Sequence, residues 1–452
     1  MNSRRYVATV ALVAAFGGLL FGYDTGVMSG ALLYLSPEFG LTPAQEGWVT
    51  STLLIGAAIG ALSGARIADG IGRRMTLILG GLIFIGGSLW CAFAGGPAQL
   101  ATARALLGVA VGAVSIVVPM YISEKVPPAV RGKLVSLNSL MIVIGQLVAY
   151  LVNSSLAHTG SWRAMLGLAA VPGVILTVGM LFLPDTPMWY ARRGLMDKAR
   201  EAAAKVGMTL EELGVGANSL NSNTNGDQAG VREQLRRLRS VPWVRSASIT
   251  AIGVGITQQV TGVNAIVYFA PTLMHQVGIP TENAVHTAIL IGAVSVVACY
   301  VGLRIVDRVG RRRLLLIGLV GNTCALVILA VAYSYAERST AIAFLALGIM
   351  ALFIAFQQAA VSLTTWLLIS ELIPSQVRGV GMGLAGLGLW GANWVVAQFF
   401  LPMVSWLSAP WTFIVFAGCG VIALIFVLRR VPETSGQTLD EVGEAFVIRY
   451  GK

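Results

Sequence analysis

Charged side chains are scarce in this chain. Asp, Glu, Lys and Arg together make up 11% of its 452 residues, whereas apolar residues make up 56%, and the mean hydropathy is +0.78. The interior of a soluble protein of this length is too small to bury so large an apolar fraction. The composition therefore excludes a water-soluble globular protein and favours one whose surface faces lipid.

Cysteine and histidine are also few. The four cysteines lie in apolar runs and show neither the spacing of a metal site nor that of a disulfide framework. The three histidines, His158, His275 and His286, fall near the face that we predict to be the outer one. The sequence contains no Ser-His-Asp set, metal cluster or phosphate-binding loop. We therefore expect neither an enzyme nor a protein with a metal or another cofactor.

Apolar runs of the length needed to cross a bilayer follow one another along the chain. They occupy residues 7–33, 48–67, 75–94, 100–121, 134–156, 164–183, 247–274, 285–306, 314–335, 341–369, 380–404 and 411–428. Six runs thus precede a polar interval and six follow it. We expect an all-α membrane protein with twelve transmembrane helices in two pseudo-symmetric six-helix bundles, formed by residues 1–190 and 246–452.

The polar interval, residues 191–245, is the one soluble segment of appreciable length. Leu, Ala, Arg, Lys and Glu recur at helical spacing in residues 195–206 and 231–238, which predicts two short helices on the cytoplasmic face. Residues 216–230 are rich in Gly, Asn and Ser and have no apolar periodicity, so we expect a flexible tether there.

Lys and Arg are unevenly distributed between the two ends of the predicted helices. With both termini in the cytoplasm, only Arg163 and Arg338 of the 31 basic residues lie near the outer face, and Arg104 lies well inside a span. Cytoplasmic loops carry the basic residues in the same way. The net charge of +11 therefore indicates orientation and not nucleic-acid binding. We expect a multi-pass protein of a bacterial inner membrane.

Two short charged patterns occur once in each half of the chain. Asp69 and Arg73 of GARIADGIGRR recur as Asp307 and Arg311 of GLRIVDRVGRR. A second pair, Glu124 and Arg131, recurs with the same step of seven residues as Glu371 and Arg378. Transporters with two halves that rock against each other are built from such duplicated helical units.

Longer motifs carry a resemblance to a known family. They are FGYDTGVMSG, the two D-x-x-G-R-R loops, PMYISE with the following RGK, PDTPMW, QQVTGVN, WLLISELIP and PETSGQTLDE. Over essentially its whole length the chain resembles the sugar porter family of the major facilitator superfamily, in particular bacterial proton-coupled symporters of the glucose and xylose type. The resemblance implies a monomer in the lipid bilayer that transports a monosaccharide together with protons by alternating access.

Amides inside apolar helices indicate where a substrate binds. Gln258, Gln259 and Asn264 lie in the seventh predicted span, among glycines that permit close approach or local unwinding. Amides offer paired donors and acceptors to the hydroxyls of a sugar, although hydrogen bonds between helices are the alternative. The resemblance implies that these three residues bind sugar. It also implies that aromatic residues line the same cavity, although for the two tryptophans the alternative is anchoring at the membrane interface. The aromatic positions are Phe21, Tyr268 with Phe269 at the outer gate, Trp366 and Trp390.

The chain departs from the family pattern at several of these positions. Ser139 stands where sugar porters usually carry Gln, and Gln146, two turns later, partly substitutes for it or simply packs. Leu389 replaces a Gln of some relatives, and the Gly-Pro of the tenth span is replaced by Ser362 and Leu363. Gln357 and Gln358 add amides to that span. The departures leave the particular sugar open.

Two charges lie well inside the predicted spans of the first half, Asp24 and Arg104. A lone charge at the bilayer centre costs about 2.5–3.5 kcal/mol on insertion scales, so such charges are usually paired or functional. The resemblance implies that this acid and this arginine couple transport to protons. The alternatives are a structural ion pair in a sugar uniporter, a non-transporting sugar sensor, and a transporter of a polyol, an organic acid or another small solute.

The repeated charges of the loops have a role in the family as well. The resemblance implies that they form a cytoplasmic latch between the halves, intact when the cavity faces outward. The simpler alternative is that they only satisfy the preference for basic residues in cytoplasmic loops. The latch residues would be Asp69, Arg73, Glu124, Arg131, Asp307, Arg311, Glu371 and Arg378.

Overall fold

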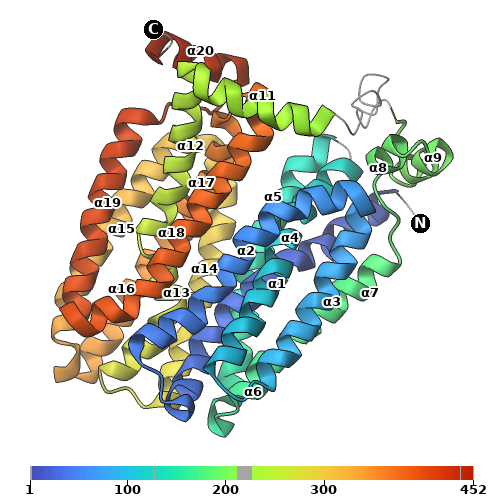
Figure 1. Cartoon of the computed structure of the whole chain (residues 1–452). Coiled ribbons are helices and arrows are strands. Elements are labelled where there is room, and N and C mark those ends of the chain that lie inside the picture. Colours follow the sequence, from blue (N-terminus) through green and yellow to red (C-terminus); the bar gives the residue numbers. More distant parts are fainter. Residues whose placement is uncertain (1–2, 127, 211–225, 438, 451–452) are drawn as a thin grey trace. The chain divides into compact units, whose positions relative to one another are not determined.

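The structure is a computed structural model that describes residues 3–126, 128–210, 226–437 and 439–450. Helices form nearly all of these ranges, and no strand occurs in them (Figure 1). Eleven of the described helical segments are long and apolar enough to cross a membrane. The helices of the first half are α1 (Ser3–Phe39), α2 (Pro43–Ile71), α3 (Arg73–Ala92), α4 (Pro97–Lys125), α5 (Pro128–Leu156), α6 (Trp162–Gly167), α7 (Ala170–Leu181), α8 (Pro187–Arg192) and α9 (Met196–Lys205).

The second half of the chain forms a similar series of helices. They are α11 (Gly226–Ser240), α12 (Pro242–Val260), α13 (Val263–Gln276), α14 (Thr281–Val309), α15 (Arg311–Ser334), α16 (Thr340–Phe356), α17 (Ser362–Leu372), α18 (Arg378–Leu407), α19 (Ala409–Arg430) and α20 (Leu439–Tyr450). Proline at the first or second position starts α12 and α19, where a missing N–H costs nothing.

The expected seventh span, residues 247–274, is divided into α12 and α13. Gly262 separates the two helices and adopts φ of 86°, a left-handed conformation that costs glycine little because it has no Cβ. An added Cβ would also lie 3.1 Å from the ring of Phe416. The break is the local unwinding that the glycines of this segment permit.

The tenth expected span remains one continuous helical segment. Between α16 and α17 it contains a π-helical turn, Gln357–Val361, which ends just before Ser362. The Gly-Pro pair that would interrupt the helix is absent, but the wider turn still distorts it. Turns of this kind are rare and often lie at functional sites.

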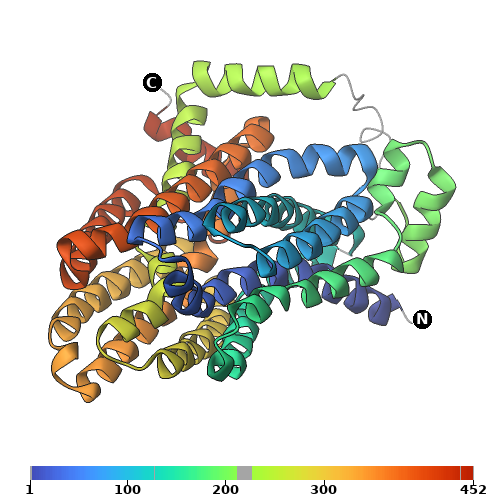
Figure 2. The same cartoon turned by 60° about the horizontal axis from the view of Figure 1, so that its bottom comes forward.

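The polar interval contains the two short helices that its spacing predicts. α9 covers most of residues 195–206, and α11 includes all of residues 231–238. Of the expected tether, residues 216–225 lie outside the described residues, and the prediction is wrong for residues 226–230, because α11 begins at Gly226. α11 runs across the neighbouring helices instead of along them (Figures 1 and 2).

The chain forms two compact units. The first unit comprises residues 1–27, 52–149 and 162–227, and the second comprises residues 28–51, 150–161 and 228–452. The ends of α1, α2 and α5 that the Lys and Arg distribution predicts to face outward therefore belong with the helices of the second repeat. We call this end of the helices the outer end.

Hydrogen bonds within the second unit explain this grouping at the outer end. Ser51 of α2 donates to the Gln398 side chain of α18 at 2.9 Å, and Gln398 donates to the Ala44 carbonyl at 3.1 Å. The Tyr150 hydroxyl of α5 donates to the Val267 carbonyl of α13 at 3.1 Å. The outer ends of two first-half helices are thus joined to α18 and α13.

Candidate functional site

A buried ion pair lies in the first unit. Asp24 of α1 is 1% exposed and Arg104 of α4 is 0% exposed. Two guanidinium nitrogens donate to the two carboxylate oxygens, Nη2 to Oδ2 at 3.3 Å and Nη1 to Oδ1 at 3.4 Å. The two predicted coupling residues are therefore brought together in a forked geometry, which is the stronger form of such a contact.

Close packing of α1 against α5 positions the carboxylate. A Cβ at Gly22 would lie 1.8 Å from the Ile142 carbonyl oxygen, so only glycine allows the two backbones to approach this closely. One turn beyond Gly22, Gly26 packs in the same way on the backbone of Gln146, 2.9 Å from its carbonyl oxygen. Asp24 lies between these two contacts on α1.

Three predicted substrate residues surround this part of the first unit. Phe21 is half-buried on α1, one turn before the Thr25 hydroxyl that donates to its carbonyl at 2.8 Å. On α5, Ser139 is half-buried and Gln146 is 5% exposed. The Gln146 Oε1 atom has no hydrogen-bond partner among the described residues. A buried carbonyl without a donor favours a ligand or a water that supplies one.

In the second unit, the break at Gly262 creates a cluster of three amides. Asn264 at the start of α13 donates from Nδ2 to Gln259 Oε1 of α12 at 2.8 Å. The same nitrogen donates to Asn393 Oδ1 of α18 at 2.7 Å. Two of the predicted residues thus meet, together with Asn393, which sequence reasoning missed. Its signal was an amide in the apolar eleventh span, which contains Gln398 as its other amide.

A second set of polar contacts holds the end of α12. Gln357, in the π-helical turn, donates to the Gln258 carbonyl at 3.2 Å and accepts from the Thr261 hydroxyl at 3.2 Å. Asn322 of α15 also donates to the Gln357 side chain. Gln258 is 8% exposed, and its Oε1 has no partner among the described atoms. The orientation of Gln357, which the sequence left open, is therefore inward, whereas Asn322 was missed.

The predicted aromatic residues differ in their surroundings. Tyr268 and Phe269 of α13 are 1% and 0% exposed, and the ring of Phe269 stacks on Phe400 of α18 with centroids 5.4 Å apart. Trp390 on α18 is buried, at 4% exposed, whereas Trp366 on α17 is 42% exposed. The aromatic pair of α13 is thus fixed by packing within the second unit.

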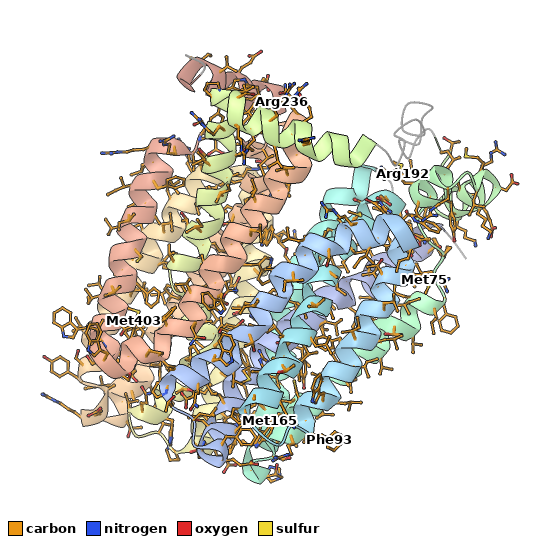
Figure 3. The ribbon with its side chains drawn as sticks, in the orientation of Figure 1. Met75, Phe93, Met165, Arg192, Arg236 and Met403 are labelled. Atoms are coloured by element: carbon orange, nitrogen blue, oxygen red, sulfur yellow. The ribbon has the colours of Figure 1, made fainter. Side chains whose placement is uncertain are left out.

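The first repeat of charged residues forms a compact cluster around one guanidinium. Arg73 is 2% exposed and lies 2.7 Å from the Asp69 carboxylate and 3.0 Å from that of Glu124. The other oxygen of Glu124 accepts from the Thr186 hydroxyl at 2.6 Å. Arg192, labelled in Figure 3, lies 3.6 Å from Asp69. Each of these residues belongs to the first unit.

The carboxylate of Asp185 holds the beginning of α3. It accepts from the backbone N–H groups of Arg73 and Arg74, at 3.1 and 3.2 Å. Helix N-terminal N–H groups have no partner within the helix, and a negative charge near them is favourable. Burial raises the pKa of Asp185, and the N–H groups that donate to it act in the opposite direction. The neighbouring Gly72 needs to be glycine, with φ of 100° and an added Cβ only 2.1 Å from Asp185 Oδ2.

The second repeat builds the same cluster. Arg311 lies 3.0 Å from Asp307 and 3.4 Å from Glu371. Glu433 accepts from the backbone N–H of Arg311 at 2.9 Å, as Asp185 does in the first repeat. The Thr434 hydroxyl donates to Glu371, as Thr186 does to Glu124. The motifs PDTP and PET therefore supply the carboxylate and the hydroxyl that complete each cluster.

The two arginines that end the seven-residue steps are placed differently. Arg131 lies in α5, and its side chain is outside the described set. Arg378 begins α18 and is exposed. Two residues later, the Val380 N–H donates to the Gln234 side chain of α11 at 3.1 Å. A contact between the halves through these arginines stays a prediction.

Comparisons with known proteins show which family the chain belongs to. Residues 10–446 match the family described as "Sugar (and other) transporter". The chain is 37% identical to the major myo-inositol transporter IolT of Bacillus subtilis, over 98% of this chain and 95% of that protein. It is 34% identical to the glucose transporter GlcP of Staphylococcus epidermidis, over 98% and 97%. A structure of the proton:xylose symporter XylE with 6-bromo-6-deoxy-D-glucose matches with a TM-score of 0.79 and 28% identity, covering 98% of this chain and all of that one.

Proposed function

Since the chain belongs to the sugar transporter family of the major facilitator superfamily, and is a membrane transporter and not an enzyme, we propose that it carries out proton-coupled symport of a monosaccharide by alternating access. The substrate is a hexose or a pentose. The distribution of Lys and Arg supports cytoplasmic termini. We further propose a monomer, surrounded by lipid, in a bacterial inner membrane.

The contact between Asp24 and Arg104 carries this proposal. A proton on the carboxylate removes its attraction to the guanidinium, while a guanidinium at 3.3 Å favours the charged carboxylate. Protonation and separation of the pair therefore promote each other. A transporter that alters this distance between its two states binds a proton more tightly in one of them, which is the requirement for coupling.

The substrate is a neutral polyhydroxylated ring. Gln259, Asn264 and Asn393 present a joined set of amides, and Gln258 presents a buried carbonyl oxygen that lacks a donor. Hydroxyl groups supply both donors and acceptors to such groups. Arg104, the one cation that the sequence places well inside the spans of the first half, is bonded to Asp24, which disfavours an organic acid as the substrate. We propose that the substrate is also contacted by Phe21, Ser139 and Gln146 of the first unit and by Tyr268, Trp366 and Trp390 of the second.

A cyclic polyol is the second candidate substrate. The 37% identity to a relative named as a myo-inositol transporter favours it. An inositol ring carries hydroxyls around its whole circumference, so the same amides suit it. A uniporter of the same fold is the alternative mechanism, in which the Asp24–Arg104 pair is structural.

The deciding experiment measures uptake into proteoliposomes that contain the purified protein. Labelled glucose, galactose, xylose and myo-inositol are each offered with and without an inward proton gradient. We expect one of the three sugars to accumulate only when the gradient is present. Accumulation of myo-inositol alone would show that the substrate is a polyol and not a sugar. Equilibration of a sugar without any response to the gradient would establish a uniporter.

A further inference from the structure

An apolar groove of about 510 Å³ lies in the second unit, away from the amides of the proposed substrate site. α14, α15, α16 and the π-helical turn form its walls. Val297, Ile317 and Leu352 line it and are 63%, 53% and 49% exposed. In a membrane-spanning helix such exposed apolar side chains face hydrocarbon, so the groove opens toward lipid.

Small side chains and the wide turn explain why the groove is hollow. Ala355 and Ala359 line its inner wall, where larger residues would fill the space. The backbone of Ala359 packs directly on α14, because a Cβ at Gly302 would lie only 2.3 Å from the Ala359 carbonyl oxygen. The π-helical turn that contains Ala359 is thus held against α14, and the groove keeps its shape.

Three exposed arginines stand at the end of this groove. Arg304 and Arg308 follow the lining residues Val301 and Ile305 by three positions each, which places them on the same face of α14. Arg313 precedes Ile317 on α15 by four positions and shares its face in the same way.

Two acids lie close to these arginines, and each has other partners. The carboxylate of Glu433 accepts from the backbone N–H groups that begin α15, at Arg311, Arg312 and Arg313. Asp307, between Arg304 and Arg308 in sequence, forms its ion pair with Arg311 at 3.0 Å. The guanidinium of Arg304 lies over the ring of Tyr300, 5.1 Å from its centroid, and this contact leaves its charge in place. The groove is therefore apolar along its length and positively charged at one end.

We propose that this groove binds one anionic phospholipid, with an acyl chain along α14 and α16 and the phosphate at Arg304, Arg308 and Arg313. Guanidinium groups bind phosphate oxygens through paired N–H donors. Basic residues near the membrane surface also favour anionic over zwitterionic lipids, because the latter carry a compensating positive charge. The site is independent of the substrate and of proton coupling.

The test uses the purified full-length protein in detergent and counts bound lipid by native mass spectrometry. Phosphatidylglycerol and phosphatidylcholine with identical acyl chains are titrated separately. We expect one phosphatidylglycerol to remain bound at concentrations at which phosphatidylcholine dissociates. Replacing Arg304 and Arg308 by Gln should weaken that binding about fivefold for each arginine. Arg66→Gln is the matched control, since Arg66 is the exposed counterpart of Arg304 in the first repeat.

A second pair of variants tests the acyl chain. Ala359→Phe and Val297→Phe fill the groove without adding polarity, and each should remove the tightly bound lipid. Val297 is the more exposed of the two positions, so its variant should fold and still test the proposal if the Ala359→Phe protein does not fold. Val331→Phe, at a 59% exposed position of α15 outside the groove, should have no effect. Equal retention of the two lipids, or undiminished retention after the groove is filled, would overturn the proposal.

Discussion

At the scale of single residues, the contact between Asp24 and Arg104 dominates the first unit. Both side chains are almost completely buried and each satisfies the charge of the other. Removal of a charge from water is costly, and a buried pair seldom increases stability over apolar packing. Such a pair is therefore better explained by a role in the transport cycle than by a contribution to folding stability.

Asp24→Asn should abolish accumulation driven by the proton gradient. The amide imitates a permanently protonated acid, so sugar binding and exchange at equal concentrations should survive. One proton moving through 100 mV supplies about 2.3 kcal/mol, which permits about 50-fold accumulation in the wild type at one-to-one coupling. The measurement compares uphill uptake with exchange in the same proteoliposomes. If the Asn variant still concentrates sugar, Asp24 does not couple transport to protons.

Gln258→Ala, Gln259→Ala and Asn264→Ala should each weaken sugar binding by about 1–3 kcal/mol, because a hydroxyl or an amide is left without its partner. Asn393→Ala should act similarly, since Asn264 donates to it at 2.7 Å. Binding is measured by calorimetry on folded, monodisperse protein. Wild-type affinity in all four variants would place the substrate elsewhere.

Much of the candidate site could be predicted from the sequence at this scale, because a polar residue in an apolar run is conspicuous. Asp24, Arg104 and the amides of the seventh span stand out for that reason. Asn322 and Asn393 are equally polar, but a single amide in a helix does not reveal which neighbour it faces. Their contacts depend on the break at Gly262 and on the π-helical turn, which neither residue encodes.

At the scale of helices, the junction of α12 and α13 determines how the amides meet. The left-handed conformation of Gly262 changes the direction of the backbone between the two helices. As a result, the Asn264 side chain can donate to Gln259, five residues before it. An uninterrupted helix places residues five apart on different faces. The short non-helical step is therefore what joins the amides into one cluster.

Gly262→Ala should lower both thermal stability and sugar affinity. A left-handed conformation costs an alanine about 1–2 kcal/mol, and the new methyl group would press on Phe416. Gly386→Ala on α18 is the matched control, because nothing lies within 4 Å of its added Cβ. Alanine should be neutral or slightly stabilising at that helical position. Equal effects of the two substitutions would show that the junction has no special geometry.

The helices themselves were largely predictable, but the irregularities within them were less so. Apolar length identifies the spans, and glycines mark the seventh as one that can unwind. The tenth span carries no comparable signal, because the Gly-Pro pair is replaced by Ser362 and Leu363. Its π-helical turn arises where Gln357 is held by α12 and α15. That distortion is a tertiary effect.

At the scale of the whole molecule, the duplicated sequence is accompanied by duplicated clusters around Arg73 and Arg311. The assignment of the outer ends of α1, α2 and α5 to the second unit could not be predicted in the same way. It depends on contacts such as that of Tyr150 with Val267, and a transporter that alternates between states makes and breaks such contacts while its sequence stays the same.

The latch hypothesis also belongs to this scale. Glu124→Gln or Arg378→Ala should shift the resting population toward the inward-facing state, since a bias of a few kcal/mol between states is sufficient. Labelling of a cysteine introduced at Ser51 should then decrease when the reagent is added from outside. Arg236→Ala on α11 is the control, because its ion pair with Glu233 is local and exposed. Labelling that changes no more in the two variants than in this control would make the charges ordinary loop residues.

The carboxylates of Asp185 and Glu433 have a consequence for the ancestry of the chain. Each follows the last span of its own repeat and binds the start of the third helix of that same repeat. In each half, the segment after the last span is therefore bound to the third helix by residues of that half alone. A polypeptide of half this length would already have possessed that contact. Duplication of such a half would therefore yield a chain in which each copy keeps its own contact between its last span and its third helix.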